Sequence, residues 1–435
     1  MDFRVEPSNL RDAIVTVPGD KSISHRALIL GSIANGVTDI SGFLAGEDCL
    51  ATLQAFRQLG VEIIERDPTT FTINGVGADG LSAPRGDLDL GNSGTAMRLL
   101  AGLMAGQAFS CTLTGDDSLK GRPMERVITP LTQMGAAIDS DCDGSPPLQI
   151  SGGLQLHGID YELPMASAQV KSCILLAGLH ARGRTSVIEP AITRDHTERM
   201  LRTMGADVVS EGGRISIEGG QQLTATRIEV PADLSSAAFV MLAVLVADNA
   251  DVLIENVGVN PTRTGVIDIL QAMGGDISLQ NRRLLGDEPV ADIRVKSSSL
   301  KGGDVDPALV SLAIDEFPVL FVAAAAASGK TGFSGIAELR VKESDRITAM
   351  AAGLRSLGIQ VDELEDGAVV HGGQFTGGRV DSFGDHRIAM ALAIAAGTAS
   401  DPVEIRNIDA VETSFPLFAV LMTELGLKIS VESAA

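Results

Sequence analysis

The chain has 435 residues, of which 45% are hydrophobic and 21% are charged, and its formal net charge is −22. This length and composition indicate a globular protein of two or three domains and exclude a disordered chain. The negative charge excludes a general nucleic-acid or acidic membrane surface as partner, because the long-range field repels polyanions.

Targeting signals and metal motifs are absent from the sequence. No segment approaches the roughly 18–20 apolar residues that span a bilayer, and the first residues, MDFRVEPS, contain no signal-peptide core. The four cysteines show neither CxxC nor a histidine at metal-ligand spacing, so we expect no disulfide framework and no metal. These features favour a cytoplasmic protein.

Aromatic residues make up 3% of the chain and mark no interface patch, so we expect a monomer.

Strand-like segments FRVE and IVTV open the chain, and six units of similar order follow them. Each unit contains a helix that begins with polar residues and is rich in alanine and leucine, which indicates burial. We expect these helices at residues 19–30, 91–102, 165–178, 232–244, 314–326 and 384–396. A short strand follows each helix, as in TDISGF, SCTLTG and TSVIEP.

A second helix in each unit ends in a Leu-Gly or Met-Gly pair that leads into a further strand, as in LGVEII and MGADVV. Glycine is favoured just past the end of a helix. The glycines are separated by 75, 70, 69, 84 and 68 residues: Gly60, Gly135, Gly205, Gly274, Gly358 and Gly426. The sequence therefore predicts six copies of a unit of about 70 residues, made of strand, helix, strand, helix and strand.

The sixth copy stops after LKISVE and lacks the extra strand that FTING, LQISG and RISIE give other copies. We expect the N-terminal segment, with FRVE and IVTV, to supply it. This predicts one domain over residues 19–228 and a second formed by residues 1–18 and 229–435. The two chain crossings near Pro18 and Pro231 would form a hinge, with the active site in the cleft between the domains.

Cationic side chains recur where the predicted helices begin. Free backbone N–H groups and the helix dipole attract anions there, whereas cations oppose the dipole. Ser, Thr, Asn and Asp at these positions have a simpler explanation as N-caps, but capping does not call for Lys or Arg. The cations therefore indicate a small, multiply anionic ligand. They lie in the segments DKS, KGRP, TRDH, KESDR and DHR, at residues 20–22, 120–123, 193–196, 342–346 and 385–387.

Two carboxylates lie among these cations. Asp315 stands in the nearly apolar segment LAIDEFP, and Glu343 directly follows Lys342. Burial raises the pKa of a carboxyl group and a neighbouring cation lowers it, so the pair can serve as base and acid at neutral pH. A helix cap for Asp315 and a surface ion pair for Glu343 are the alternative interpretations.

Motifs of other enzyme classes are missing. The sequence contains no HExxH or GxSxG, which argues against zinc proteolysis and hydrolysis by a nucleophile elbow. The segment PGDKS differs from a nucleotide-binding P-loop because Asp20 separates Gly19 from Lys21.

The chain resembles the 5-enolpyruvylshikimate-3-phosphate (EPSP) synthases over essentially its whole length. The ordered motifs PGDKSISHRAL, LGNSGTAMR, KGRPMERVITPL, SAQVKS, LRVKESDRI and FGDHRIAMA carry the resemblance. It implies an α/β fold, a two-domain inside-out α/β barrel built from six βαβαββ repeats. It also implies a transferase of the shikimate pathway of aromatic amino-acid biosynthesis, which transfers enolpyruvyl from phosphoenolpyruvate to the 5-hydroxyl of shikimate 3-phosphate and releases phosphate. No metal or organic cofactor is implied, and the two substrates are the only partners.

The resemblance also implies residue roles. Shikimate 3-phosphate contacts are implied for Lys21, Ser22, Arg26, Ser167, Gln169, Arg194, Asp315 and Lys342. Phosphoenolpyruvate contacts are implied for Lys21, Gly94, Arg122, Gln169, Arg346 and Arg387, and Asn92, Ala168 and His386 are further candidates in the same motifs. In the implied mechanism Asp315 takes the proton of the 5-hydroxyl. Glu343, with Lys21, protonates the methylene carbon, and the tetrahedral intermediate then eliminates phosphate.

The sequence departs from the family pattern near its end. Many members carry a cation shortly before the final Phe-Pro, where VETSFP places Thr413 or Ser414, so no residue is assigned to that phosphoenolpyruvate contact. Signals for the herbicide glyphosate are mixed. Gly94 resembles sensitive members, whereas Ala168, Leu99 and the segment RDHTE resemble the group that contains tolerant ones. We expect sensitivity, because an alanine methyl at position 94 is the usual obstacle.

Two other functions are alternatives. The sister enzyme that transfers enolpyruvyl to UDP-N-acetylglucosamine shares the fold, but it normally has a cysteine in the loop that reads GDDSLKGRP here and Asn in place of Ser22. A non-catalytic repeat scaffold that binds an anionic metabolite is the second. Asp315 and Glu343 argue against it, because anion binding alone does not favour buried carboxylates.

Overall fold

The structure is a computed structural model that describes residues 1–433, apart from the side chain of Cys142. It divides into two units with separate hydrophobic cores. Unit 1 comprises Met1–Pro18, Pro231–Leu284 and the chain from Pro289 onward, and unit 2 comprises Gly19–Val230 and Leu285–Glu288.

The described residues of unit 2 form three sheets that combine parallel with antiparallel pairs. In order of pairing, the first contains β14 (Leu223–Thr224), β3 (Ala34–Ser41), β5 (Thr70–Val76) and β4 (Glu62–Asp67), with β15 (Arg227–Glu229) also paired to β3. The second contains β6 (Leu88–Asp89), β7 (Cys111–Thr114), β9 (Leu148–Ile150) and β8 (Ile138–Asp139). The third contains β10 (Asp160–Glu162), β11 (Arg184–Ile188), β13 (Arg214–Glu218) and β12 (Val208–Glu211).

The described residues of unit 1 form another three sheets. The first contains β17 (Asp276–Leu285), β18 (Glu288–Lys296), β16 (Asp251–Gly258) and β2 (Ala13–Val15). The second contains β19 (Lys330–Phe333), β21 (Gly367–His371) and β20 (Val361–Leu364). The third contains β22 (Gly378–Asp381), β23 (Val403–Arg406), β1 (Asp2–Glu6) and β24 (Lys428–Glu432).

Helices connect these strands in both units. Unit 2 contains α1 (Lys21–Ser32), α2 (Glu47–Gln58), α3 (Gly94–Ala105), α4 (Asp117–Lys120), α5 (Glu125–Gln133), α6 (Ala168–Gly178) and α7 (His196–Thr203). Unit 1 contains α8 (Leu234–Val246), α9 (Gly265–Ala272), α10 (Val310–Ala313), α11 (Phe317–Ala326), α12 (Arg346–Ser356), α13 (His386–Gly397) and α14 (Phe418–Glu424). Short 3₁₀ helices span Cys142–Gly144, Pro307–Leu309, Ala337–Val341 and Asp409–Thr413. Over residues 1–433, no helix is both long enough and apolar enough to cross a membrane.

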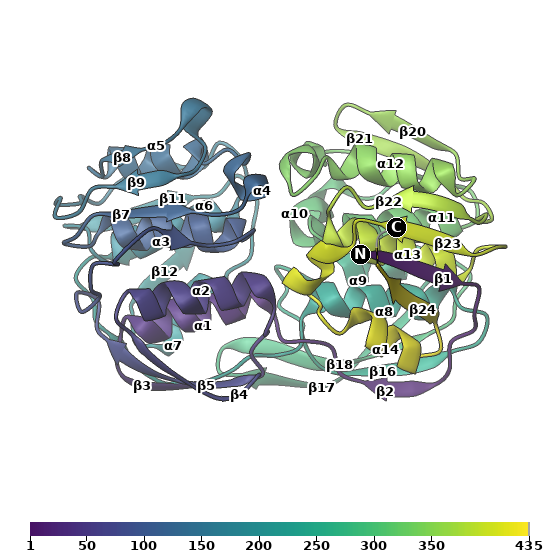
Figure 1. Cartoon of the computed structure of the whole chain (residues 1–435), viewed down its shortest axis with the longest axis horizontal. Coiled ribbons are helices and arrows are strands. Elements are labelled where there is room, and N and C mark those ends of the chain that lie inside the picture. Colours follow the sequence, from purple (N-terminus) through teal and green to yellow (C-terminus); the bar gives the residue numbers. More distant parts are fainter. Residues whose placement is uncertain (434–435) are drawn as a thin grey trace. The chain divides into compact units, whose positions relative to one another are not determined.

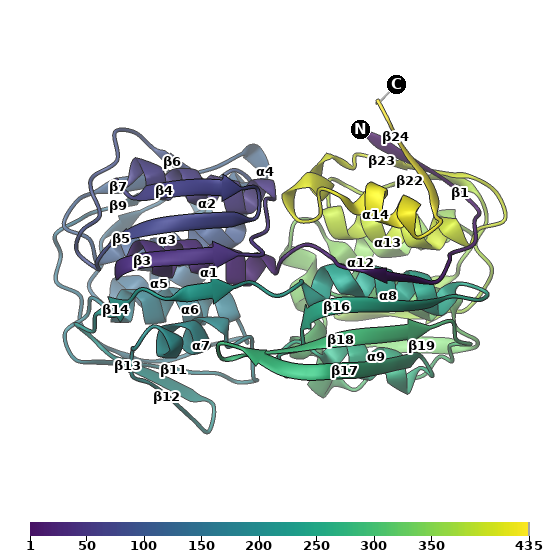
Figure 2. The same ribbon diagram turned by 90° about the horizontal axis from the view of Figure 1, so that it is seen from below.

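Alanine- and leucine-rich helices form the centre of each core, as the sequence predicts. In unit 2, α3 packs against both α1 and α6, and in unit 1, α8, α11 and α13 pack on one another (Figure 1). Figure 2 shows the strands β3, β5 and β4 in front of α1. Because few polar residues interrupt these helices, their burial holds each helix start in a fixed place on the core.

Second helices in the predicted units end in the same way. Among the described helices, α2, α5, α7, α9, α12 and α14 each end two residues before a glycine with positive φ: Gly60 (87°), Gly135 (102°), Gly205 (92°), Gly274 (96°), Gly358 (84°) and Gly426 (108°). A positive φ is unfavourable for a residue with a Cβ, so glycine is the favoured residue at this place. The six glycines whose spacing indicated a repeat thus share one conformation.

The N-terminal segment joins two different sheets of unit 1. Strand β1 lies between β23 and β24 and is antiparallel to both, with Phe3 opposite Ile405 and Val431. Strand β2, from the segment IVTV, pairs in parallel with β16 instead. The expectation that both segments join the last copy is therefore correct only for FRVE. Alternating apolar residues mark a strand without identifying its neighbour.

The tip of the β17–β18 hairpin packs against α7 of unit 2. Leu285–Glu288 belongs to unit 2, although most of both strands belongs to unit 1. Arg199 Nη1 donates a hydrogen bond of 2.7 Å to the Asp287 carbonyl, and His196 Nδ1 lies 2.7 Å from Glu288 Oε1. The sequence gives no sign of this, because charged residues in a hairpin turn are usually exposed.

Candidate active site

Helix α1 carries three predicted site residues at its amino end. Asp20 caps the helix and accepts a hydrogen bond of 2.8 Å from a backbone N–H of the first turn. Lys21 Nζ lies 2.9 Å from Asp48 Oδ2, and Arg26 Nη1 donates to the Ser22 carbonyl at 3.0 Å. Asp20 therefore caps the helix, and the adjacent residue Lys21 supplies a cation.

Arg26 is a buried cation held by neutral groups. Its Nε donates to Thr197 Oγ1 at 2.7 Å and its Nη2 donates to Ser172 Oγ at 2.8 Å. Burial lowers the pKa of Arg26 to about 10, against the opposing effect of nearby Glu198. The guanidinium stays charged at neutral pH, and the hydroxyls that hold it do not neutralise that charge.

Serine residues cap α3 and α6, and a side-chain bridge joins these helices. Ser93 Oγ and Ser167 Oγ each accept from a backbone N–H of the first turn, at 3.1 and 3.4 Å. Arg98 Nη1 donates to Gln169 Oε1 at 2.6 Å, and Gln169 Nε2 donates to Thr95 Oγ1 at 2.9 Å. The bridge fixes the orientation of the Gln169 amide.

Arg122 reaches back to the start of α3. Its Nη2 donates to Asn92 Oδ1 at 2.5 Å, and Asn92 Nδ2 donates to Asp116 Oδ2 at 2.8 Å. A Cβ at Gly94 would lie 3.0 Å from Arg98 Nη1 and 3.2 Å from Arg122 Nη1. Glycine at position 94 therefore keeps the space beside two guanidinium groups open.

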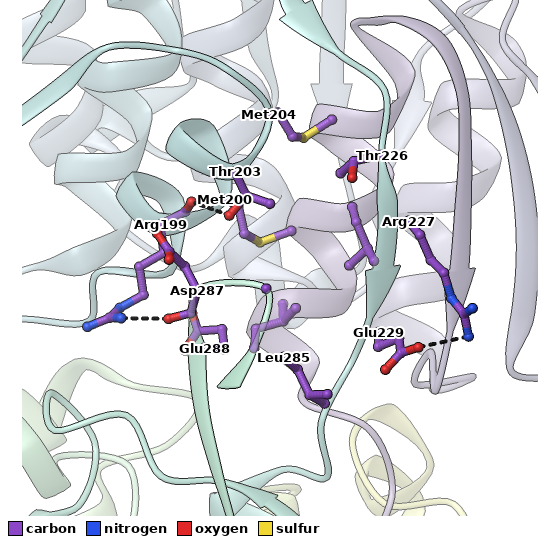
Figure 3. Close-up of a pocket in the computed structure, with 13 residues that line it drawn as sticks. Arg199, Met200, Thr203, Met204, Thr226, Arg227, Glu229, Leu285, Asp287 and Glu288 are labelled. Atoms are coloured by element: carbon purple, nitrogen blue, oxygen red, sulfur yellow. Dashed lines mark hydrogen bonds and ion pairs between the residues drawn. The ribbon is translucent and has the colours of Figure 1, made fainter. Parts of the chain in front are cut away.

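Arg194 is half-buried and lies just before α7. The other end of α7 lines an open cavity, shown in Figure 3. Met200, Met204 and Leu285 give this cavity an apolar wall, and none of the predicted site residues lines it. We therefore locate the site of unit 2 at the helix starts.

In unit 1, Arg346 at the start of α12 gathers three carboxylates. Its side chain is 1% exposed, with Nε 2.8 Å from Asp385 Oδ2, Nη2 2.7 Å from Glu343 Oε2 and Nη1 3.6 Å from Asp315 Oδ1. Burial lowers the pKa of Arg346, but Asp385 and Glu343 outweigh burial and raise it above its ordinary value. Among the described residues, Arg346 Nη1 has no hydrogen-bond partner, which leaves donors for an anion.

Asp315 lies beside two cations and stays partly accessible. Its Oδ1 is 3.8 Å from Lys342 Nζ and 3.6 Å from Arg346 Nη1, and the side chain is 16% exposed. Arg387 Nη1 donates to the Asp315 carbonyl at 2.9 Å. The two cations favour the ionised carboxylate, which is the form that a general base needs.

The predicted residues thus fall into two groups, which we call the cluster of unit 2 and the cluster of unit 1. The cluster of unit 2 contains Lys21, Ser22, Arg26, Asn92, Gly94, Arg122, Ser167, Ala168, Gln169 and Arg194. The cluster of unit 1 contains Asp315, Lys342, Glu343, Arg346, His386 and Arg387. The first offers cations and helix starts to an anion, and the second combines two accessible carboxylates with cations. Over residues 1–433, no group of three or more His, Cys, Asp or Glu side chains is placed to hold a metal ion.

Several residues that contact these predicted residues were not predicted from the sequence. Arg98 follows Gly94 by one helical turn, and this spacing is the signal that could have placed both on one face of α3. Asp48, the partner of Lys21, comes from a different helix, 27 residues further along the chain. No local pattern identifies such a pair.

Known proteins resemble the chain in sequence and structure. A sequence model of the family "EPSP synthase (3-phosphoshikimate 1-carboxyvinyltransferase)" matches residues 5–422. The 3-phosphoshikimate 1-carboxyvinyltransferase of Alkalilimnicola ehrlichii is 58% identical over 99% of this chain and 97% of that protein. The EPSP synthase structure from Acinetobacter baumannii is 53% identical, with a TM-score of 0.89 over 99% of this chain and 100% of that chain. The enolpyruvyl transferase NikO from Streptomyces tendae has a TM-score of 0.79 at 17% identity, over 100% and 99% of the two chains, which shows a shared fold.

His25 makes the stability of the chain depend on pH. Burial, and then Lys21 and Arg26, lower the pKa of His25 well below its ordinary value of 6.5. The unfolded chain therefore takes up the proton first as the pH falls. We expect this residue to reduce the free energy of unfolding by up to about 1.4 kcal/mol between pH 7.5 and 5.5.

Urea titrations of wild type and His25→Gln at both pH values measure this contribution. The variant should lose less stability than the wild type between pH 7.5 and 5.5, whereas His157→Gln, at an exposed position, should behave like the wild type. Equal losses in all three proteins would show that His25 does not cause the effect.

Proposed function

Because the chain belongs to the EPSP synthase family, we propose that it transfers the carboxyvinyl group of phosphoenolpyruvate to the 5-hydroxyl of shikimate 3-phosphate and releases phosphate. The chain is a transferase of the shikimate pathway of aromatic amino-acid biosynthesis. One observation carries the chemical part of the proposal: Arg346 holds Glu343 and lies beside Asp315. A base, an acid and an anion-binding cation thus meet in one place.

Shikimate 3-phosphate is assigned mainly to the cluster of unit 2. The guanidinium groups of Arg26 and Arg194 bind the phosphate, because their planar forks match two oxygens at once. The buried charge of Arg26, held only by neutral oxygens among the described residues, supports this role. The complete proposed set is Lys21, Ser22, Arg26, Ser167, Gln169 and Arg194 from unit 2 and Asp315 and Lys342 from unit 1.

Phosphoenolpyruvate is assigned to arginines of both clusters. Arg122, Arg346 and Arg387 bind its carboxylate and phosphate, and Gly94 lets it approach the start of α3. The open space beside Gly94 supports this assignment. The complete proposed set is Lys21, Gly94, Arg122, Gln169, Arg346 and Arg387, with Asn92, Ala168 and His386 beside them.

The proposed reaction proceeds by addition and elimination. Asp315 takes the proton of the 5-hydroxyl while that oxygen forms a bond to C2 of phosphoenolpyruvate. Glu343, with Lys21, gives a proton to the methylene carbon, which becomes a methyl group in a tetrahedral intermediate. Loss of a methyl proton and cleavage of the C2–O bond to phosphate then restore the double bond. In this step the methyl proton returns to Glu343 and the proton held by Asp315 leaves with the phosphate, so neither carboxyl group is consumed.

The proposal extends to the architecture. We propose that the chain forms an inside-out α/β barrel of six βαβαββ repeats, in domains of residues 19–228 and residues 1–18 plus 229–435. Six sheets within residues 1–433, the six equivalent glycines and the pairing of β1 with β23 and β24 support it.

We also propose that the protein acts as a monomer in the cytoplasm. Sedimentation velocity giving the mass of a dimer would contradict the first of these two points.

A coupled assay for phosphate release tests the reaction and the base together. Wild type should release phosphate from phosphoenolpyruvate only when shikimate 3-phosphate is present, and UDP-N-acetylglucosamine should not replace it. Asp315→Asn should lower kcat by about 100-fold or more, because the base is lost. The exposed control Asp401→Asn should keep full activity. Release that needs UDP-N-acetylglucosamine would reject the proposed substrate, and full activity of Asp315→Asn would reject the proposed base.

Gly94→Ala tests the phosphoenolpyruvate assignment. The added methyl would meet the ends of two flexible arginines, so the variant should fold while the guanidinium groups shift. We expect wild type to be inhibited by glyphosate in competition with phosphoenolpyruvate. In the variant, both the glyphosate Ki and the KM for phosphoenolpyruvate should rise about tenfold or more, the range that an overpacked contact costs.

Gly86→Ala is the matched control, because it adds the same methyl group at an exposed glycine where a Cβ would meet no heavy atom within 4 Å. It should leave both constants within about threefold of wild type. Full turnover of the wild type at glyphosate concentrations far above the KM for phosphoenolpyruvate would contradict the prediction.

A further inference from the structure

A buried ion cluster lies next to the arginines assigned to the phosphate of shikimate 3-phosphate, and no step of the reaction uses it. Lys171 Nζ on α6 lies 2.7 Å from Glu198 Oε1 on α7 and 3.0 Å from Glu189 Oε2 in the segment after β11. The side chains of Lys171 and Glu198 are 1% exposed and that of Glu189 is 5% exposed. Lys171 is therefore too deeply buried to touch a substrate.

The cluster is poorly balanced for a device that only stabilises the fold. One lysine faces two carboxylates, and burying ions costs free energy that apolar side chains of the same volume would not cost. Burial raises the pKa of Glu189, and Lys171 offsets this only in part. Among the described residues, Glu198 Oε2 has no hydrogen-bond partner. Stabilisation of the fold alone therefore does not explain why these three charged side chains are buried together.

One side of the cluster holds the segment that carries Arg194. Lys171 Nζ donates to the Thr193 carbonyl at 3.5 Å, and the Thr193 hydroxyl donates to Glu189 Oε1. Arg194 is the next residue along the chain. The backbone just before Arg194 is therefore tied to α6 through a buried lysine.

The other side holds Arg26. Ser172 follows Lys171, and Thr197 precedes Glu198, and their hydroxyl oxygens lie 2.7 Å apart. Both oxygens accept hydrogen bonds from the Arg26 guanidinium, at 2.8 and 2.7 Å. Any shift of α6 against α7 at the ion cluster thus moves both acceptors of Arg26.

We propose that Lys171 is a positioning residue for shikimate 3-phosphate, which fixes Arg26 and Arg194 at the spacing that its phosphate group requires. The inference rests on the proposed assignment of these two arginines. Binding groups work best when a second layer of contacts locks their geometry, and losing such a layer weakens binding without removing any direct contact.

Lys171→Met removes the charge and keeps a long unbranched side chain, one heavy atom shorter than that of lysine. We expect the Kd for shikimate 3-phosphate, measured by isothermal titration calorimetry, to rise about tenfold or more. The KM for phosphoenolpyruvate at saturating shikimate 3-phosphate should stay within about twofold. The triple variant Lys171→Met, Glu189→Gln, Glu198→Gln relieves the two unpaired carboxylates. Its urea midpoint should recover towards the wild type while the weak binding persists.

Ile174→Ala is the matched control. Ile174 is fully buried on the same helix, and its apolar side chain forms no hydrogen bond or ion pair with these polar groups. It should lower the urea midpoint and leave the Kd for shikimate 3-phosphate unchanged. Loss of affinity in this control equal to that of Lys171→Met would overturn the inference, since general destabilisation would then explain both.

Two further variants separate this inference from the proposed function. Arg194→Ala should weaken shikimate 3-phosphate binding, and an unchanged Kd would overturn the assignment of Arg194 and the inference with it. Weak binding in Arg194→Ala with normal binding in Lys171→Met would overturn the positioning role alone. If Lys171→Met does not fold, Thr193→Val serves in its place. It keeps the ion pairs and should raise the same Kd about threefold, whereas an unchanged Kd would count against the inference.

Discussion

Buried guanidinium groups at the starts of buried helices impose the main constraint on this structure. A buried positive charge must be compensated, and the two units do so in opposite ways. Arg26 is held by hydroxyl and carbonyl oxygens and its pKa is lowered, so its charge is left to act on a bound anion. Arg346 is surrounded by carboxylates and its pKa is raised, so it organises acidic groups. The two buried arginines thus fit the two roles proposed for them, anion binding in unit 2 and support of acid–base chemistry in unit 1.

The two proposed roles, anion binding and acid–base chemistry, both depend on helices that begin in the same way. In α1, α3, α6, α12 and α13 a serine or aspartate caps the helix and satisfies the backbone N–H groups. The next residues, such as Lys21 and Gly94, are the ones proposed to contact ligands. Burial of the alanine- and leucine-rich helices fixes these starts, so chemistry varies between copies while the scaffold stays the same.

Patterns within one element carried most of what the sequence could predict. Apolar helices, the six glycines and most N-terminal caps follow from local rules of burial, φ and hydrogen bonding and are found in the structure, but Asp195 forms no cap hydrogen bond at the start of α7. The substrate assignments came from the resemblance and not from local patterns. Contacts between elements could not be predicted from the sequence. Strand β2 pairs with β16, the tip at Leu285–Glu288 packs on α7, and Lys171 joins Glu189 and Glu198. Each depends on which elements become neighbours, and residue spacing does not encode that.

Arg26, whose hydrogen bonds go to neutral oxygens, is the residue proposed to receive the phosphate of shikimate 3-phosphate. A crystal structure of the chain with this substrate alone tests this proposal most directly. We expect phosphate oxygens within hydrogen-bond distance of the Arg26 and Arg194 guanidinium groups and the Ser22 hydroxyl, with the bonds from Arg26 to Thr197 and Ser172 retained. A phosphate bound away from Arg26, or Arg26 still without an anion when the substrate is seen elsewhere in the chain, would contradict it.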